Sequence, residues 1–457
     1  MNKNGFTSID PSTGQENQGY PDWEPARLDR ALDRAAAAAP GWAALGIQER
    51  CAFLRRAGDV LLRERHRYAE LMSREMGKVT AEGLAEIEKC AGACKYYADE
   101  APRMLADELI ETDAKKSLVT YQPLGVLLAI MPWNFPFWQA IRAAAPALAA
   151  GNVVALKHAD NVPGCGLALE EVFREAGFPE GVFQTLMVTV PGVDKVIRDP
   201  RVQAVTLTGS ERAGVAVGQA AGETLKKCVL ELGGSDAFVV LEDADLVSAA
   251  KQGCLSRYQN AGQSCIAAKR FILVERVADA FLEAFRAQAA ALKSGDPRGE
   301  GVTLGPLARL DLRDKLHEQV QDALSQGAVS VLGCQKPAGP GAFYPASILD
   351  RVRPGMRAWR EEVFGPVATI IRVKDKEEAL AVANASSYGL GGSVWTADRE
   401  RGEAFARRMA CGSAFVNRMV KSDQRLPFGG VKKSGHGREL SRHGILEFVN
   451  VKTLSLD

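Results

Sequence analysis

The sequence predicts an α/β protein with two parallel-sheet domains, and three observations support this prediction. The chain has 457 residues, which is too long for one compact core. Short apolar strands alternate with helices up to about residue 240, as is typical of a parallel sheet that is covered on both faces. The same alternation restarts near residue 245, which indicates a second α/β unit.

The first unit is expected to begin with helices and to continue as alternating strands and helices. Between residues 26 and 110 apolar residues recur every three or four positions, which predicts amphipathic helices. Residues 117–132 (SLVTYQPLGVLLAIMP) are rich in strand-forming residues and lead into the turn PWNFP. A helix (WQAIRAAAPALAAG), the strand NVVALK, a helix ending at Gly177 and the strands AVTLTGS, CVLELGG and FVVL follow.

The second unit is expected to contain the strand RFILVE and helices at Val277–Leu292 and Leu310–Gln326. The segment SVWTADRERGEAFARRM predicts a strand followed by a helix, and residues 295–306 and 333–345 predict loops. The tail ILEFVNVKTLSL alternates polar and apolar residues, so we expect an edge strand that can pair with another subunit.

Composition and charge argue against several classes of protein. The formal net charge is +1, so we expect neither nucleic-acid nor membrane binding. The N-terminal segment MNKNGFTSIDPSTGQ lacks the apolar core of a signal peptide, and Gly125, Pro132 and Asn134 interrupt the longest apolar stretch. These features predict a cytoplasmic protein.

The nine cysteines are scattered and include no CxxC pair, which favours free thiols in a reducing compartment. Cys90 and Cys94 lie one helical turn apart without a nearby histidine or second cysteine pair. We interpret them as buried packing residues, and we expect no metal site.

Three residues are candidates for chemistry. Cys265, in GQSCIAAKR, enters an expected helix whose N-terminal amides would lower its pKa and favour the thiolate, although a lone cysteine is more often a packing residue. Glu231, in ELGG at a strand end, can activate water or simply face solvent. Asn134, in PWNFP, can donate to an oxyanion or only stabilise a rigid turn.

A second group of residues suits a dinucleotide. Gly209 and Ser210 lie between a strand and a helix, where backbone amides can bind a pyrophosphate, although no GxGxxG motif is present. Lys157 and Asp160 follow the neighbouring strand and can reach ribose hydroxyls. The remaining candidates are Trp133, Glu362 and Phe364, for a second ribose contact and a ring against the nicotinamide.

Together, and in this order, the motifs PWNFP, strand-Lys, TGS, ELGG, GQ-x-C, E-x-FGP, PFGG and KKSG-x-GREL resemble the aldehyde dehydrogenase superfamily over nearly the whole chain. The resemblance implies a thioester mechanism. Cys265 would be the nucleophile, Asn134 and the Cys265 amide the oxyanion donors, and Glu231 the base that activates water for hydrolysis. Glu439 is similar to a residue that relays protons in some members.

The resemblance also implies a division of the chain. The NAD(P)-binding domain, with a doubly wound parallel sheet, would comprise residues 1–114 and 132–232. An α/β catalytic domain would comprise residues 233–427. A small β arm for oligomerisation would comprise residues 115–131 and 440–457, in a homo-dimer or homo-tetramer.

Several segments look like bacterial succinate-semialdehyde dehydrogenases, among them KKCVLELGGSD and FGGVKKSGHGREL. Arg142 and Ser422 match residues that bind the substrate carboxylate in related enzymes, and Arg142 can equally be a salt-bridged helix residue. Gln259 stands where some of these enzymes carry an arginine, and His436 stands where an aromatic residue is common. Lys421 and Arg425 can supply the missing charge or face solvent.

The carboxylate of Asp160 can accept from a ribose 2′-hydroxyl and repels a 2′-phosphate, so we expect NAD to be preferred over NADP. Four alternatives remain open: oxidation of glutarate semialdehyde, oxidation of a neutral aliphatic aldehyde, transfer of the acyl group to CoA, and a non-catalytic binding protein. The hydrolytic base Glu231 argues against CoA, and the intact set of Cys265, Glu231 and Asn134 argues against loss of catalysis.

Overall fold

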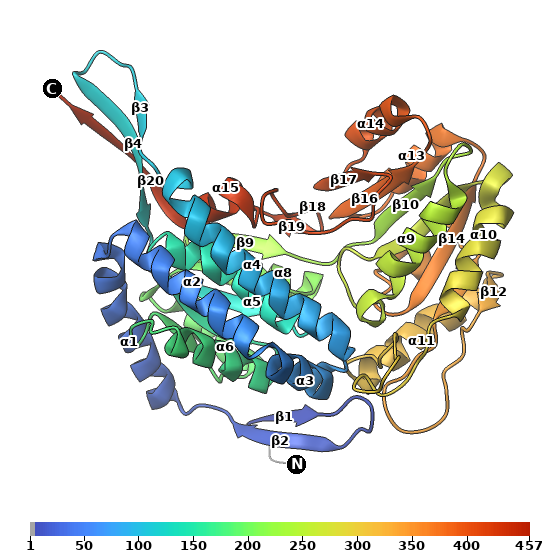
Figure 1. Cartoon of the computed structure of the whole chain (residues 1–457), viewed down its shortest axis with the longest axis horizontal. Helices are drawn as coiled ribbons and strands as arrows, with labels where there is room; N and C mark the ends of the chain where they lie inside the picture. The colour runs from blue at the N-terminus through green and yellow to red at the C-terminus, as the bar shows by residue number, and fades with distance from the viewer. Residues whose placement is uncertain (1–4) are drawn as a thin grey trace.

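The structure, a computed structural model, describes residues 5–457 and contains two lobes and a projecting arm (Figure 1). Each lobe is built on a mostly parallel sheet, as predicted. The chain passes between the lobes where strand β9 leads into β10, and it returns after β17. Within the described residues, no helix is long and apolar enough to cross a membrane.

The first lobe begins with a hairpin and four helices that confirm the helical periodicity. The hairpin pairs β1 with β2, and β1 contacts helix α3. Cys90 and Cys94 are fully buried in this packing, as expected. The elements are β1 (Gly5–Ile9), β2 (Glu16–Pro21), α1 (Pro25–Ala44), α2 (Ile47–Arg63), α3 (Arg65–Met76) and α4 (Thr80–Met104).

The first lobe is centred on a six-stranded sheet with the order β7-β6-β5-β8-β9-β19. The chain adds β6 and β7 on one side of β5 and then β8 and β9 on the other, so the order reverses between β5 and β8. Only β19 is antiparallel. The elements are β5 (Val126–Met131), α5 (Pro136–Ala149), β6 (Val153–His158), α6 (Pro163–Glu175), β7 (Phe183–Thr185), α7 (Val190–Arg198), β8 (Val202–Thr208), α8 (Glu211–Glu223), β9 (Lys227–Glu231) and β19 (Gly435–His436).

The second lobe contains a seven-stranded sheet with the order β12-β13-β14-β11-β10-β16-β17, in which only β12 is antiparallel. Its helices confirm the two long helices predicted from the sequence. The elements are β10 (Asp236–Val240), α9 (Leu246–Tyr258), η1 (Gln259–Gly262), β11 (Ala268–Val274), α10 (Glu275–Ala290), α11 (Leu310–Ser325), β12 (Val329–Leu332), β13 (Ser347–Asp350), α12 (Arg357–Arg360), β14 (Val367–Val373), α13 (Lys376–Asn384), β16 (Gly391–Trp395), α14 (Arg399–Arg408) and β17 (Ser413–Val416); β15 (Tyr388–Gly389) pairs separately with β18 (Val431–Lys432).

The arm is a three-stranded antiparallel sheet that consists of β3 (Glu108–Ile110), β4 (Lys116–Pro123) and β20 (Val449–Leu456). It is smaller than expected, because residues 126–131 form β5 in the centre of the six-stranded sheet. Gly125, at φ +125°, separates the two strands. Residues 441–448 form helix α15 (Ser441–Ile445) and the turn η2 (Leu446–Phe448), and α15 contacts α4 and α5. Residues 1–4, which the expected first segment included, lie outside the described residues.

A buried carboxylate fixes the start of α5, the helix that follows the PWNFP turn. Glu86 on α4 accepts hydrogen bonds from the amides of Phe137 and Trp138 at 2.9 Å each. Its other oxygen pairs with the ammonium of Lys78, and both side chains are almost completely buried. The negative charge lies at the positive end of the helix dipole. Glu86 therefore couples the position of α5 to that of α4.

We predict that Glu86→Ala destabilises the protein strongly. The substitution leaves the Lys78 ammonium buried without a partner and removes the acceptor for two helix amides. Breaking such a pair costs about 3–5 kcal/mol in the free energy of unfolding, which a lower midpoint in thermal unfolding would report. Glu88→Ala, at an exposed position of the same helix, is the control. Equal midpoints for the two variants would contradict the assignment.

Candidate active site

Several of the residues expected to hold a dinucleotide lie at or just after the carboxyl ends of strands in the first sheet. The chain leaves β5 into Trp133 and Asn134, and it leaves β8 into Gly209 and Ser210. These two exits flank the point where the strand order reverses, which is where open α/β sheets bind ligands. Lys157 is the last residue but one of the adjacent strand β6. The fold therefore brings together positions that are far apart in the sequence.

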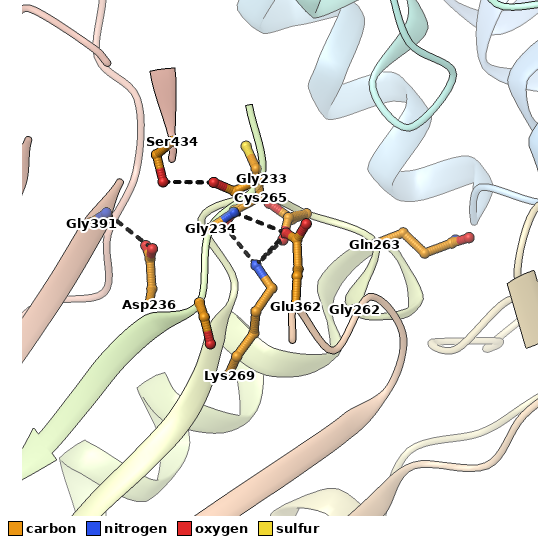
Figure 2. Close-up of polar contacts among 12 residues, drawn as sticks. Gly233, Gly234, Asp236, Gly262, Gln263, Cys265, Lys269, Glu362, Gly391 and Ser434 are labelled. Carbon is orange, nitrogen blue, oxygen red and sulfur yellow. Dashed lines mark hydrogen bonds and ion pairs between the residues drawn. The ribbon is translucent and has the colours of Figure 1, made fainter. Parts of the chain in front are cut away.

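Cys265 lies between the two lobes, in the loop that joins η1 to β11 (Figure 2). Three consecutive residues before it, Asn260, Ala261 and Gly262, have φ values of 55°, 52° and 71°. A Cβ atom on Gly262 would lie 2.3 Å from the carbonyl oxygen of Gly365, so only glycine fits there. Left-handed backbone at non-glycine residues is strained and is common at functional sites. The loop is therefore a distorted turn that presents Cys265.

A buried lysine holds this loop in place. The ammonium of Lys269, on β11, donates to the carbonyls of Ser264 and Cys265 at 2.8 and 2.6 Å (Figure 2). It also pairs with Glu362 at 3.1 Å, and Glu362 accepts from the amide of Gly234 at 3.1 Å. One cation therefore connects the motifs GQ-x-C, ELGG and E-x-FGP.

The two glycines of ELGG are needed because other groups approach them closely. A Cβ atom on Gly233 would lie 2.4 Å from a carboxylate oxygen of Glu362, and one on Gly234 would lie 2.7 Å from the carbonyl of Cys265. Ser434, in KKSG, donates to the carbonyl of Gly233 at 2.6 Å (Figure 2). Another motif is thereby tied to the same point.

The environment of Cys265 differs from the one expected. Cys265 precedes strand β11, so no helix N-terminus acts on it, and the prediction of a lowered pKa is wrong. Burial raises the pKa of the thiol to about 11, although the nearby cations of Lys269 and Arg142 oppose that shift. The resting side chain is a thiol at neutral pH, and its attack on a carbonyl requires loss of the proton.

Asn134 is fixed beside the cysteine loop. Its amide nitrogen donates to the carbonyl of Gln263 at 3.0 Å, and its amide oxygen accepts from Gln139 at 3.2 Å. Asn260 donates to the Asn134 carbonyl at 2.8 Å. These contacts orient the amide group and leave one of its two N–H groups for an oxyanion.

Glu231 ends β9 in a buried position where neither carboxylate oxygen has a hydrogen-bond partner. Burial and the negative charge of Glu439 raise the pKa of Glu231 well above its usual range, while Arg142 and Arg438 oppose the shift. A buried carboxylate that binds a proton readily suits a general base. Burial also raises the pKa of Glu439.

Arg142 lies on α5 with its side chain 3% exposed, and its guanidinium pairs with Glu439. It donates to the hydroxyl of Thr208 at 3.2 Å and stacks over the ring of Phe428 at 4.7 Å. The salt-bridged alternative for Arg142 is therefore the arrangement found. Its charge is offset by Glu439, which connects helix α5 to the GREL motif.

The other residues expected to hold a cofactor make the following contacts. Lys157 is buried, donates to the carbonyl of His158 at 2.7 Å and pairs with Asp160. The Ser210 hydroxyl caps α8 by accepting from the Ala213 amide at 3.3 Å. The rings of Trp133 and Phe364 meet edge to face at 5.7 Å between centroids. Glu362, by contrast, pairs with Lys269 and accepts a hydrogen bond from the Gly234 amide.

Ser422 is buried and accepts a hydrogen bond from the ammonium of Lys89, on α4, at 2.6 Å. Arg425 is largely exposed and pairs with Asp423 at 2.6 Å, and Lys421 is exposed. Neither cation therefore supplies charge inside the site in this arrangement.

The sequence motifs do not predict roles for Lys269, Glu86 and Lys89. Lys269 carries a recognisable signal, because a charged residue at the start of the apolar strand AKRFILV must find a buried partner. Glu86 and Lys89 lie in an ordinary helical pattern of alternating charges and carry no such signal. The nine thiols are free, and the described residues contain no group of three metal-ligating side chains.

Comparison with known proteins identifies the family of this chain. The sequence model of the aldehyde dehydrogenase family matches residues 1–454. The chain belongs to the aldehyde dehydrogenase family. It is 49% identical to "Succinate semialdehyde dehydrogenase [NAD(P)+] Sad" of Escherichia coli, over 98% of this chain and 97% of that protein. It is 48% identical to "Probable succinate-semialdehyde dehydrogenase [NADP(+)]" of Synechocystis, over 98% and 99%.

Solved structures of the family share the whole fold. The succinic semialdehyde dehydrogenase of Streptococcus pyogenes, in complex with NADP+ as the cofactor, superimposes with a TM-score of 0.97 at 38% identity, over 99% of both chains. The expected aldehyde dehydrogenase fold is thereby confirmed. The expected preference for NAD finds no support, since the names of these relatives give NADP or both cofactors.

We predict a specific pH dependence for Glu231→Gln. Because the pKa of Glu231 is raised, the base gains competence as the pH rises through that pKa, so the wild-type kcat increases with pH. The variant should lose this dependence and about 10²- to 10⁴-fold in kcat. Rapid-mixing kinetics should show an initial burst of reduced cofactor, because the first half-reaction needs no hydrolysis. A variant with the wild-type pH profile would contradict the assignment.

Proposed function

We propose that this family member oxidises succinate semialdehyde to succinate through a thioester on Cys265, which water hydrolyses. The observation that carries the proposal is the combination of a presented cysteine, an oriented amide beside it and a buried unpaired carboxylate, with the charge of Arg142 acting on both the thiol and the carboxylate. The names of the relatives at 48–49% identity support the substrate.

The residues divide the chemistry among them. Cys265 attacks the aldehyde carbon once its proton is lost, and the Asn134 amide with the Cys265 backbone amide stabilises the oxyanion. After oxidation of the carbon, Glu231 takes a proton from water, which attacks the thioester and releases the acid. Glu439 lies close enough to Glu231 to raise its pKa, and this proximity suits a second proton acceptor.

The carboxyl-terminal edge of the first sheet suits a nicotinamide dinucleotide. The strand order reverses there, and the N-terminus of α8 behind Gly209 and Ser210 suits a pyrophosphate. Lys157 and Asp160 would bind a ribose, and the paired rings of Trp133 and Phe364 would lie against the nicotinamide. When bound, the dinucleotide accepts the hydride that the aldehyde carbon loses.

An assembly of identical subunits is part of the proposal. The arm presents Val451, Leu454 and Leu456 as exposed apolar residues on strand β20. Such an edge strand can pair with a second copy. Size-exclusion chromatography with light scattering distinguishes dimer, tetramer and monomer. The cytoplasmic location remains a prediction from the sequence.

We predict that succinate semialdehyde exceeds butyraldehyde, acetaldehyde and glutarate semialdehyde in kcat/KM by more than about tenfold, or about 1.4 kcal/mol. Formation of reduced cofactor, followed at 340 nm, gives the rates, and Cys265→Ala is the blank. Equal rates for neutral aldehydes would overturn the substrate and leave the family assignment in place. Release of an acyl-CoA when CoA is added would favour the CoA-transferring alternative.

We predict that NADP supports a kcat/KM at least equal to that with NAD. Lys157 pairs with Asp160 and offsets its charge, so Asp160 repels a 2′-phosphate less than an isolated carboxylate would. Initial rates with each cofactor at saturating aldehyde test this expectation, with Asp160→Asn as the comparison. A strong preference for NAD that Asp160→Asn abolishes would restore the original interpretation of Asp160.

A further inference from the structure

Lys89 places an ammonium group next to Ser422, a residue already expected to face the substrate. It lies on α4, and its Nζ donates to the Ser422 hydroxyl at 2.6 Å. The same nitrogen lies 4.0 Å from the centre of the Trp138 ring, on α5. The ammonium is therefore held between a helix face and the loop after β17.

In the part of the chain that the structure describes, Lys89 forms no ion pair. Glu86, one turn earlier on α4, is occupied by Lys78 and two backbone amides. Asp423, next to Ser422, pairs with Arg425. The partly buried ammonium of Lys89 therefore has only a hydroxyl and an aromatic ring as partners, and no negative charge balances it. An anionic ligand would supply that charge.

The other cations near the proposed active site are less suited to binding an anionic ligand. The charge of Arg142 is offset by Glu439, and Arg425 is exposed. Arg142 nevertheless shows where Lys89 lies relative to the reaction centre. Its positive charge acts on the Cys265 thiol, where it opposes the rise in pKa, and also on the Lys89 ammonium, whose pKa it lowers. Lys89 and Cys265 therefore both lie within range of the charge of Arg142.

We propose that Lys89 is the specificity-determining cation that, with the Ser422 hydroxyl, binds the carboxylate of the semialdehyde. Lys89 then supplies the positive charge that Gln259 does not provide. In this arrangement Arg142 acts mainly as the partner of Glu439. The inference rests on the proposed function, and it assigns the substrate's carboxylate end to the contact between α4 and the loop after β17.

The test compares two four-carbon substrates, succinate semialdehyde and butyraldehyde, in wild type and Lys89→Met. The substitution keeps an unbranched side chain that is one atom shorter and removes the charge. We expect kcat/KM for succinate semialdehyde to fall by about 10- to 100-fold, mainly through KM, as is typical for loss of a charge-assisted hydrogen bond. The value for butyraldehyde should stay within about twofold, since the neutral aldehyde makes no such bond.

Three further variants sharpen the test. Lys89→Arg retains the charge and should recover much of the preference. Ser422→Ala should also lower kcat/KM for succinate semialdehyde, but by a smaller factor than Lys89→Met. Lys95 lies on α4 and pairs with Asp59 at a partly exposed position, so Lys95→Met should leave kcat/KM for both substrates unchanged.

A second readout is the pH dependence of the ratio of the two kcat/KM values. Burial and Arg142 lower the pKa of Lys89 to about 8, and Cys90, Glu86 and Asp423 oppose the shift. The ammonium is present below that pKa and is lost above it. The preference for succinate semialdehyde should therefore decline as the pH rises through about 8. The ratio cancels the titrations of Cys265 and Glu231, which affect both substrates.

The outcomes separate the two proposals. If wild type does not prefer succinate semialdehyde, the proposed substrate fails and the carboxylate site fails with it. If wild type has the preference and Lys89→Met keeps it, only the assignment of Lys89 is overturned. Equal losses for both substrates in Lys89→Met would also overturn it, because they indicate a structural role.

Discussion

The ammonium of Lys269 is the interaction on which the arrangement of the active site depends. It is fully buried, and it binds two carbonyls of the cysteine loop and the carboxylate of Glu362. Glu362 in turn holds the amide of Gly234. These contacts fix the strained turn before Cys265 against the segment that joins the two lobes. A backbone with three consecutive left-handed residues needs such external support.

Helix α5 carries polar side chains that bind residues of the proposed active site. Every residue of this helix is buried, so each polar side chain on it needs a partner. Gln139 donates to Asn134, and Arg142 pairs with Glu439 and contacts Thr208. At the start of the helix, Glu86 binds two backbone amides. Glu86 therefore positions α5, and α5 orients residues of the proposed active site.

Glu231 and Glu439 illustrate how burial creates reactivity here. The two carboxylates are close enough for each charge to matter to the other, and one arginine is shared between them. Glu439 has the ion pair, while Glu231 has no hydrogen-bond partner. Because of this difference, Glu231 is the carboxylate that is free to accept a proton from a nearby donor.

Much of the fold could be predicted from local patterns. The helices α2, α10 and α11 follow apolar periodicity, and α6 ends before Gly177 at φ +83°. The patterns failed where the chain changes partner without changing its strand character. Residues 126–131 look like a continuation of the arm strand, yet Gly125 redirects them into the central sheet. The predicted helix at Cys265 failed because tertiary contacts impose an irregular turn before a strand.

The sequence by itself determined the order of strands and helices, the family, and the candidate residues for the chemistry, because these depend on local periodicity and on motifs of a few residues. Only the tertiary structure decided which charges neutralise one another. Arg142 meets Glu439 and Lys269 meets Glu362 across long sequence separations, whereas Lys89 meets only the neutral hydroxyl of Ser422. The physical reason is that a buried charge is defined by its partners, and those partners are assembled only when the sheets and helices pack.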